Sequence, residues 1–120
     1  ILISNSDDHL RNHGFLYGGP QGWRLAPAYD LNPVPVDIKP RVLATAIDTD
    51  DTAASLELAL SVADYFELDA SEARKIAAEV GQAAFGWRSV AKQRGLTPGE
   101  IDGMASAFEH DDLRAACNDI

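Results

Sequence analysis

The chain has 120 residues, enough for one domain, and 46% of them are hydrophobic, enough to build a core. Its formal net charge of −9 argues against direct nucleic-acid binding, because phosphate backbones are bound mainly by clustered Lys and Arg. No apolar run approaches the ~20 residues that cross a bilayer, and Cys117 alone cannot form an internal disulfide. These features predict a soluble cytoplasmic protein with no membrane contact.

The first segment begins with the apolar pair Leu2-Ile3, which we interpret as the end of a helix or strand, and continues into a polar run. In that run Asp7 precedes Asn12 by five residues, the spacing of the base and a metal ligand in the kinase catalytic loop H-R-D-x-x-x-x-N. A carboxylate can accept the proton of a hydroxyl nucleophile. Amide and carboxylate oxygens are the ligands that Mg²⁺ prefers.

Two short apolar and aromatic runs follow, Gly14 to Tyr17 and Trp23 to Ala26. The glycine- and proline-containing stretch between them is a turn by composition, so the region predicts a β-hairpin. Such a hairpin would place Asn12 and Asp30 at its two open ends. Residues distant in sequence could then share one magnesium site.

The segments NSDDHLRNHGFL (residues 5–16) and WRLAPAYDLNPVP (residues 23–35) resemble catalytic segments of the HipA family, bacterial toxin-type serine/threonine kinases with a protein-kinase-like fold. The run from Ser55 to Phe108 resembles the helical C-terminal region of that family. The resemblance implies transfer of a phosphoryl group from ATP to a protein hydroxyl. It implies Asp7 as the base, with Asn12 and Asp30 as Mg²⁺ ligands.

Two departures from ordinary protein kinases also resemble the HipA family. His9 stands two residues after Asp7, where kinases usually carry a lysine, and Tyr29-Asp30-Leu31 replaces Asp-Phe-Gly. His9 either orients the loop by donating to a backbone carbonyl or contacts a phosphate, and Arg11 pairs with an acid or a phosphate. We name His9 and Arg11 as ATP-binding candidates.

Three neighbouring residues have less direct interpretations. Asp8 either tunes the site or hydrogen-bonds within the loop, and His13 and Tyr29 are expected to pack or to orient the loop.

The chain contains neither a G-x-G-x-x-G nor a G-x-x-x-x-G-K-[ST] phosphate loop, and all its lysines follow the catalytic segment. We therefore expect the nucleotide-covering lobe to lie upstream of this chain, in a longer kinase, and the isolated fragment to be inactive. The resemblance also implies a toxin–antitoxin pair, with a protein substrate and a small DNA-binding antitoxin as partners.

Segment 31–46 holds three prolines, which predict an extended loop. Within it, Lys39 and Arg41 either hold an acidic or phosphorylated group or belong to a solvated loop. An acidic cluster follows: Asp48, Asp50 and Asp51. We interpret it as charge at a helix start, because a calcium loop would need further spaced ligands.

Helical periodicity begins near Thr52 and predicts two core-facing stripes. The first comprises Leu56, Leu60, Val62, Ala63 and Phe66; the second comprises Ala73, Ile76, Ala77, Val80, Ala84, Trp87 and Ala91.

Helix boundaries are also indicated. Asp69 with Glu72 and Thr97 with Glu100 fit the capping box, and Gly95 is a predicted helix stop. A further helix is expected over residues 98–108, and a last helical turn from Asp111.

The expected fold is therefore α+β: a fragment of the C-terminal lobe of a protein-kinase-like fold, with a short β-hairpin followed by a mostly helical bundle. Residues 1–51 would supply the catalytic loop, hairpin and metal-binding segment, and residues 52–120 the helical region of the same domain. Two other functions stay open: a noncatalytic protein-interaction module, and a metal-dependent hydrolase. The hydrolase would draw its ligands from Asp7, Asp8, His9, His13 and Asp30.

Overall fold

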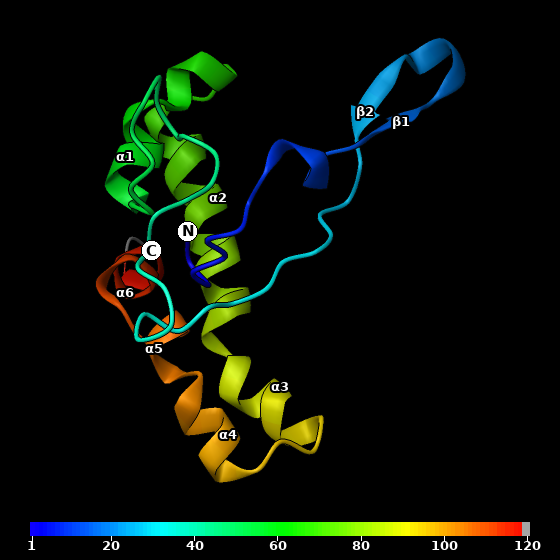
Figure 1. Cartoon of the computed structure of the whole chain (residues 1–120). Helices are drawn as coiled ribbons and strands as arrows, with labels where there is room; N and C mark the ends of the chain where they lie inside the picture. Colours follow the sequence, from blue (N-terminus) through cyan, green and yellow to red (C-terminus); the bar gives the residue numbers. More distant parts are fainter. Residues whose placement is uncertain (119–120) are drawn as a thin grey trace.

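A computed structural model describes residues 1–118, which extend over 48 × 30 × 29 Å (Figure 1). The strands are β1 (Phe15–Tyr17) and β2 (Trp23–Leu25). The helices are α1 (Leu56–Ser61), α2 (Ala70–Phe85), α3 (Trp87–Gln93), α4 (Pro98–Gly103), α5 (Ala105–Phe108) and α6 (Asp111–Asn118). Three 3₁₀ turns complete the set: η1 (Leu10–Asn12), η2 (Gly19–Gln21) and η3 (Ala63–Phe66). The predicted α+β organisation, a hairpin followed by a mostly helical remainder, is confirmed.

The β-hairpin projects away from the helices (Figure 1). Its strands are antiparallel, with Phe15 opposite Leu25 and Tyr17 opposite Trp23, and the Tyr17 and Trp23 ring centroids lie 5.2 Å apart. Gly22, just before β2, has φ 79°, a left-handed conformation that glycine adopts without steric cost. The side chains of both strands are exposed, so the hairpin contributes no residue to the core.

Residues 31–46 form a loop, as predicted, and the loop continues to residue 54; within it lies one isolated antiparallel bridge, between Val42 and Ala53. The interpretation of Leu2-Ile3 as the end of a helix or strand is wrong. These residues lie in a turn, in which the Ser4 N–H donates to the Ile1 carbonyl at 3.0 Å. Leu2 is apolar because it packs against Leu56 and Leu113 in the core. For Leu2, tertiary packing and not a regular element explains the apolar residue.

The acidic cluster is not a helix start, which corrects the prediction. Helix α1 begins after its N-cap Ser55, whose side chain accepts from the Leu58 N–H. Asp48 and Asp51 instead accept hydrogen bonds from backbone N–H groups one and two residues later, at 2.8 and 2.9 Å. Aspartate stabilises turns in this way, so the cluster shapes the loop that precedes the helices.

The core lies where α2 packs against α6. Gly81 of α2 and Ala116 of α6 approach so closely that a Cβ built on Gly81 would lie 2.9 Å from the Ala116 Cβ. The buried core cluster comprises Leu2, Leu56, Leu113 and Ala116. Within residues 1–118 no helix is long and apolar enough to span a membrane.

The two predicted apolar stripes are only partly buried. Ala73 of the second stripe is buried, but Ile76 and Val80 are 47% and 51% exposed, because α2 turns its small residues toward α6. Phe66 of the first stripe is also exposed; it is the last residue of η3, and Glu67 after it has a left-handed conformation. The second stripe is also divided between two helices, because α2 ends at Phe85 and α3 begins at Trp87.

The capping signals are confirmed. Both capping boxes form, at Asp69 and at Thr97. Gly95 ends α3 with φ 86°, and the Leu96 N–H donates back to the Ala91 carbonyl. The helix expected over residues 98–108 is interrupted at Met104, which gives α4 and α5.

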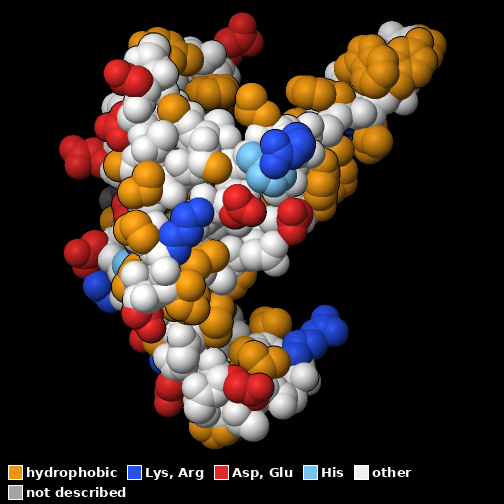
Figure 2. Space-filling model, in the orientation of Figure 1, with side chains coloured by type: hydrophobic (Ala, Val, Ile, Leu, Met, Phe, Trp, Pro, Cys, Tyr) orange, Lys and Arg blue, Asp and Glu red, His pale blue; other side chains and the backbone are white. Residues whose placement is uncertain are grey.

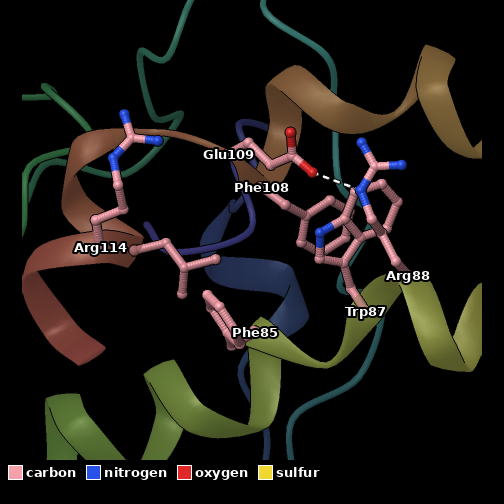
Figure 3. A pocket seen from close by; sticks show the side chains of 7 residues that line it. Phe85, Trp87, Arg88, Phe108, Glu109 and Arg114 are labelled. Carbon is pink, nitrogen blue, oxygen red and sulfur yellow. Dashed lines mark hydrogen bonds and ion pairs between the residues drawn. The ribbon is translucent and has the colours of Figure 1, made fainter. Parts of the chain in front are cut away.

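Helices α3 and α5 meet through stacked rings. The Trp87 and Phe108 centroids are 4.4 Å apart, and the Arg88 guanidinium lies over the Trp87 ring (Figure 3). Arg88 also binds Glu109 at 2.6 Å and Asp102 at 2.9 Å. A cavity of about 380 Å³ opens beside these rings.

Candidate active site

The loop around Asp7 is held by hydrogen bonds from residues that lie 30–38 positions later in the chain. The Ser4 carbonyl accepts from the Val34 N–H at 3.1 Å, and the Ser6 carbonyl accepts from the Ala44 N–H at 3.2 Å. The Thr45 hydroxyl donates to the Asp8 carbonyl. These bonds fix the backbone on both sides of Asp7.

Asn12 and Asp30 meet at the base of the hairpin. The Asn12 Nδ2 donates to the Asp30 Oδ2 at 3.1 Å, although 18 residues separate them. The hairpin predicts this meeting, because Asn12 ends η1 just before β1 and Asp30 follows β2. An amide and a carboxylate side by side supply the oxygen atoms that Mg²⁺ prefers, so this pair fits a magnesium site.

The backbone at Asp30 is unusual. Its φ is 56°, a left-handed conformation that is uncommon outside glycine. Two contacts hold it there: the Asn32 Nδ2 donates to the Asp30 Oδ1 at 2.7 Å, and the Tyr29 hydroxyl donates to the Arg11 carbonyl at 2.9 Å. The expectation that Tyr29 orients the loop is confirmed.

Asp7 is exposed, and within residues 1–118 its carboxylate has no hydrogen-bond partner. Its carbonyl closes a tight turn by accepting from the His9 N–H at 3.1 Å. Figure 2 shows acidic side chains gathered beside histidine and a basic side chain where the hairpin joins the body. A free, solvent-facing carboxylate in such a turn is able to approach a substrate hydroxyl.

His9 does not make the hydrogen bond expected of it. Its Nδ1 is buried, and no atom of residues 1–118 is its partner, so no donation to a backbone carbonyl occurs. A buried polar atom without a partner is rare in native proteins. Arg11 is exposed, with no ion pair among the described residues. Their expected contacts with ATP stay predictions.

Asp8 and His13 form a pair across η1, with the His13 Nε2 and the Asp8 Oδ1 2.8 Å apart. Asp8 therefore makes a hydrogen bond within the loop, one of the two roles expected of it, and His13 is its partner. Both residues line a cavity of about 610 Å³ whose other walls are mostly apolar. The cavity lies between the first segment, the loop around Thr45 and helix α2.

The site includes residues that sequence reasoning missed. Asn5 is buried, and its Oδ1 accepts from the Asn32 N–H at 3.3 Å, which joins the catalytic loop to the segment after Asp30. Asn32 in turn contacts Asp30. The Asn32 side chain bonds the Asp30 side chain and not a backbone group, so the usual turn signals do not mark Asn32.

Arg41 has neither of the two roles expected of it. Its guanidinium is turned inward and pairs with Asp112 at 2.7 Å, so it is neither solvated nor free for a phosphorylated group. Lys39 is exposed, in agreement with a solvated loop residue.

The hydrolase alternative needs a cluster of metal ligands. Throughout residues 1–118 no group of three or more His, Cys, Asp or Glu side chains is arranged to hold a metal ion. Asp8 and His13 bind each other, while Asp30 binds Asn12 and Asn32 instead.

A family model described as "HipA-like C-terminal domain" matches residues 1–87 of the chain. The match contains the whole candidate site and ends at the start of α3. Comparison with curated proteins and with solved structures finds no match.

Proposed function

This chain belongs to the family of HipA-like C-terminal domains, and on that premise we propose that it is the catalytic C-terminal part of a HipA-like serine/threonine protein kinase. The observation that carries the proposal is the 3.1 Å contact between Asn12 and Asp30, with Asp7 five residues before Asn12. A base and two converging metal ligands are the parts that phosphoryl transfer requires from this half of a kinase.

Each residue has a defined task in this proposal. Asn12 and Asp30 hold Mg²⁺, which when bound neutralises the phosphate oxygens of ATP. Asp7 orients the hydroxyl of the protein substrate and accepts its proton. The hydroxyl oxygen then bonds to the γ-phosphorus while the bond from that phosphorus to the β–γ bridging oxygen breaks, and ADP leaves.

His9 and Arg11 contact the phosphates of ATP in this proposal. Among the described residues, neither the buried His9 Nδ1 nor the exposed Arg11 guanidinium has a partner, which supports a role for both residues in binding a further group. Because Arg11 lies within η1 and His9 precedes it, both stay close to Asn12 in the chain.

The proposed setting is a cytoplasmic toxin–antitoxin pair, in which the kinase phosphorylates a protein and a small DNA-binding antitoxin supplies any contact with DNA. The isolated 120-residue chain is proposed to be inactive, because positioning and charge neutralisation supply most of the catalysis and no phosphate-binding loop lies in it. Robust ATP-dependent phosphorylation by this chain alone would contradict that point.

The test uses the complete gene product that contains this chain. Asp7→Asn should lower phosphoryl transfer by about 10²–10⁴-fold while leaving Mg²⁺-ATP binding largely intact, because the carboxylate acts on the way to the transition state. Asp30→Asn should weaken Mg²⁺-ATP binding as well, and Asn12→Ala should lie between them. The measurements are nucleotide affinity with and without Mg²⁺, and phosphate transfer to a protein acceptor.

Asp50→Asn is the matched control, because Asp50 is an exposed carboxylate outside the site. It should leave both measurements unchanged. Normal turnover of Asp7→Asn, or normal Mg²⁺-ATP binding by Asp30→Asn, would refute the assigned roles.

A noncatalytic interaction module is the second candidate, and the exposed apolar hairpin favours it. Absence of nucleotide binding in the complete gene product would support this alternative over the kinase.

A further inference from the structure

Arg41 joins distant parts of the chain through one guanidinium group. Its Nη1 binds the Asp112 Oδ2 of α6 at 2.7 Å, its Nε donates to the Ser4 Oγ at 3.1 Å, and its Nη2 donates to the Ile1 carbonyl at 3.2 Å. The side chains of Arg41 and Asp112 are each 19% exposed, so water screens the pair only weakly. The planar guanidinium can serve three acceptors at once because its donors point in fixed directions.

Asp112 connects this arrangement to the helical half. Its second oxygen, Oδ1, accepts from the Leu56 N–H at the start of α1 at 2.7 Å. Burial acts to raise the pKa of Asp112, but the Leu56 N–H and the Arg41 guanidinium outweigh burial and lower this pKa below its usual value. The carboxylate is therefore charged at neutral pH, and both of its oxygens are engaged.

Ser4 is the residue that this arrangement holds most closely. It is 1% exposed and has φ 54°, a conformation that a residue with a side chain adopts only when its surroundings impose it. Its Oγ donates to the Ala107 carbonyl of α5 at 2.8 Å while accepting from Arg41. Asp7 lies three residues further along the chain, so the conformation of Ser4 sets the direction in which the catalytic loop leaves the core.

We propose that Arg41 and Asp112 are positioning residues that fix Ser4 and thereby hold the Asp7 loop in its working position. The expected effect of these two residues on turnover rests on the proposed kinase function. Their expected effect on the position of the loop does not. Within residues 1–118 neither Arg41 nor Asp112 makes a hydrogen bond or ion pair to Asn12 or Asp30.

The test compares Arg41→Gln and Asp112→Asn with the matched control Arg88→Gln in the complete gene product. Arg88 of α3 also binds two carboxylates, Glu109 (Figure 3) and Asp102, but within residues 1–118 it makes no hydrogen bond or ion pair to Ser4, Arg41 or Asp112. At a temperature where all variants are folded, Arg41→Gln and Asp112→Asn should lower kcat by about 10–100-fold, because small misplacements of a catalytic group are costly. KM for Mg²⁺-ATP should change much less, and Arg88→Gln should match the parent.

Arg41→Lys separates positioning from simple charge pairing. A lysine keeps the attraction to Asp112 but lacks the planar fork that reaches Ser4 and Ile1 at the same time. We expect Arg41→Lys to recover thermal stability relative to Arg41→Gln without recovering kcat. Full recovery of kcat would overturn the positioning role.

Hydrogen exchange provides a readout that needs no activity. The amides of Val34 and Ala44 donate to the Ser4 and Ser6 carbonyls, so their protection reports the position of the loop. Protection should fall on the order of tenfold in Arg41→Gln and stay unchanged in Arg88→Gln.

The outcomes separate the two proposals. A parent protein that transfers no phosphate would refute the kinase function. Amide protection alone would then test whether Arg41 and Asp112 hold the Asp7 loop. Unchanged protection, or equal losses in Arg41→Gln and Arg88→Gln, would overturn the inference. An active parent with an unimpaired Arg41→Gln variant would overturn the inference while leaving the kinase function in place.

Discussion

Residues 1–54 contain two three-residue strands and no α-helix, whereas residues 55–118 carry the six α-helices of the described chain. The helical half is stabilised by local signals, two capping boxes and a glycine stop, and by the packing of α2 on α6. The first half has few buried apolar residues of its own. Hydrogen bonds to distant parts of the chain hold its loops instead, through Ser4, Asn5 and Arg41.

Because of this difference, we expect substitutions in the helical half to change mainly stability and substitutions in the first half to change mainly the geometry of the candidate site. Changes at the α2–α6 contact should alter the free energy of unfolding of the whole chain, because that contact forms the core. Changes in the first half should alter where the candidate catalytic groups lie. Changes in the hairpin should stay local, because its side chains do not reach the core.

The largest expected effect on stability is that of Gly81→Ala. The added Cβ would lie 2.9 Å from the Ala116 Cβ and 3.3 Å from the Ala116 backbone carbon, so the helices must move apart. We expect a loss of about 1–3 kcal/mol in the free energy of unfolding, measured by urea denaturation. This loss runs against the ~1 kcal/mol by which helix propensity favours alanine over glycine.

Gly103→Ala is the control for this change. A Cβ on Gly103 of α4 would meet nothing within 4 Å, so this variant should be no less stable than the parent. Equal destabilisation by both variants would show that α2 and α6 are not in close contact.

The next effect concerns pH and His110, which lies where the two halves meet. Burial lowers the pKa of His110, and the nearby Arg41 charge lowers it further, whereas Asp112, 3.9 Å away, acts in the opposite direction. The unfolded chain therefore binds a proton near pH 6.5 that the folded chain binds only at lower pH. Stability should fall as the pH falls from about 6.5, by at most about 1.4 kcal/mol per pH unit for one group.

His110→Asn should remove this part of the pH dependence. Asparagine is favoured immediately before a helix such as α6, so the variant keeps a residue suited to the position. Urea denaturation of parent and variant from about pH 5 to about pH 7, a range that contains the reference pKa of histidine, measures how the free energy of unfolding depends on pH. Identical slopes would show that His110 is not the titrating group.

The smallest expected effect on stability is that of Trp23→Thr in the hairpin. Trp23 is 70% exposed and contacts Tyr17 with the two rings tilted by 51°, so its loss should cost at most about 1 kcal/mol, the upper range for a cross-strand pair. The variant should also reduce any self-association through the exposed apolar hairpin face. Light scattering over a concentration series measures this self-association. Trp87→Thr, which removes the stack on Phe108, should cost more. The reverse order would mean that the hairpin packs on the body.

Much of the candidate site could be predicted because its signals are local. The turn between two short aromatic runs predicts the hairpin, and the hairpin predicts that Asn12 and Asp30 meet. Capping pairs and the Gly95 stop are likewise contained in a few neighbouring residues. Each prediction depends on geometry within one turn or one helix end, and each was confirmed.

The failed predictions share a different physical cause. Arg41 looked like a loop cation because its partner Asp112 lies 71 residues away. Leu2-Ile3 looked like the end of a regular element, but Leu2 is apolar because α1 and α6 cover it. Ile76 and Val80 fit a core stripe, yet the small residues of α2 face α6 because only they allow the two helices to approach.

By itself the sequence determined the α+β order of elements, the hairpin and the pairing of Asn12 with Asp30, because these follow from turn chemistry and periodicity along a short stretch of chain. Only the tertiary structure decided how the loop before Asp7 is held. Ser4, Arg41 and Asp112 come from three separate segments, and no local pattern marks them as partners. Burying these charges and this hydroxyl would cost free energy if they were unpaired. Their mutual hydrogen bonds offset that cost, and these bonds form only when the chain has folded.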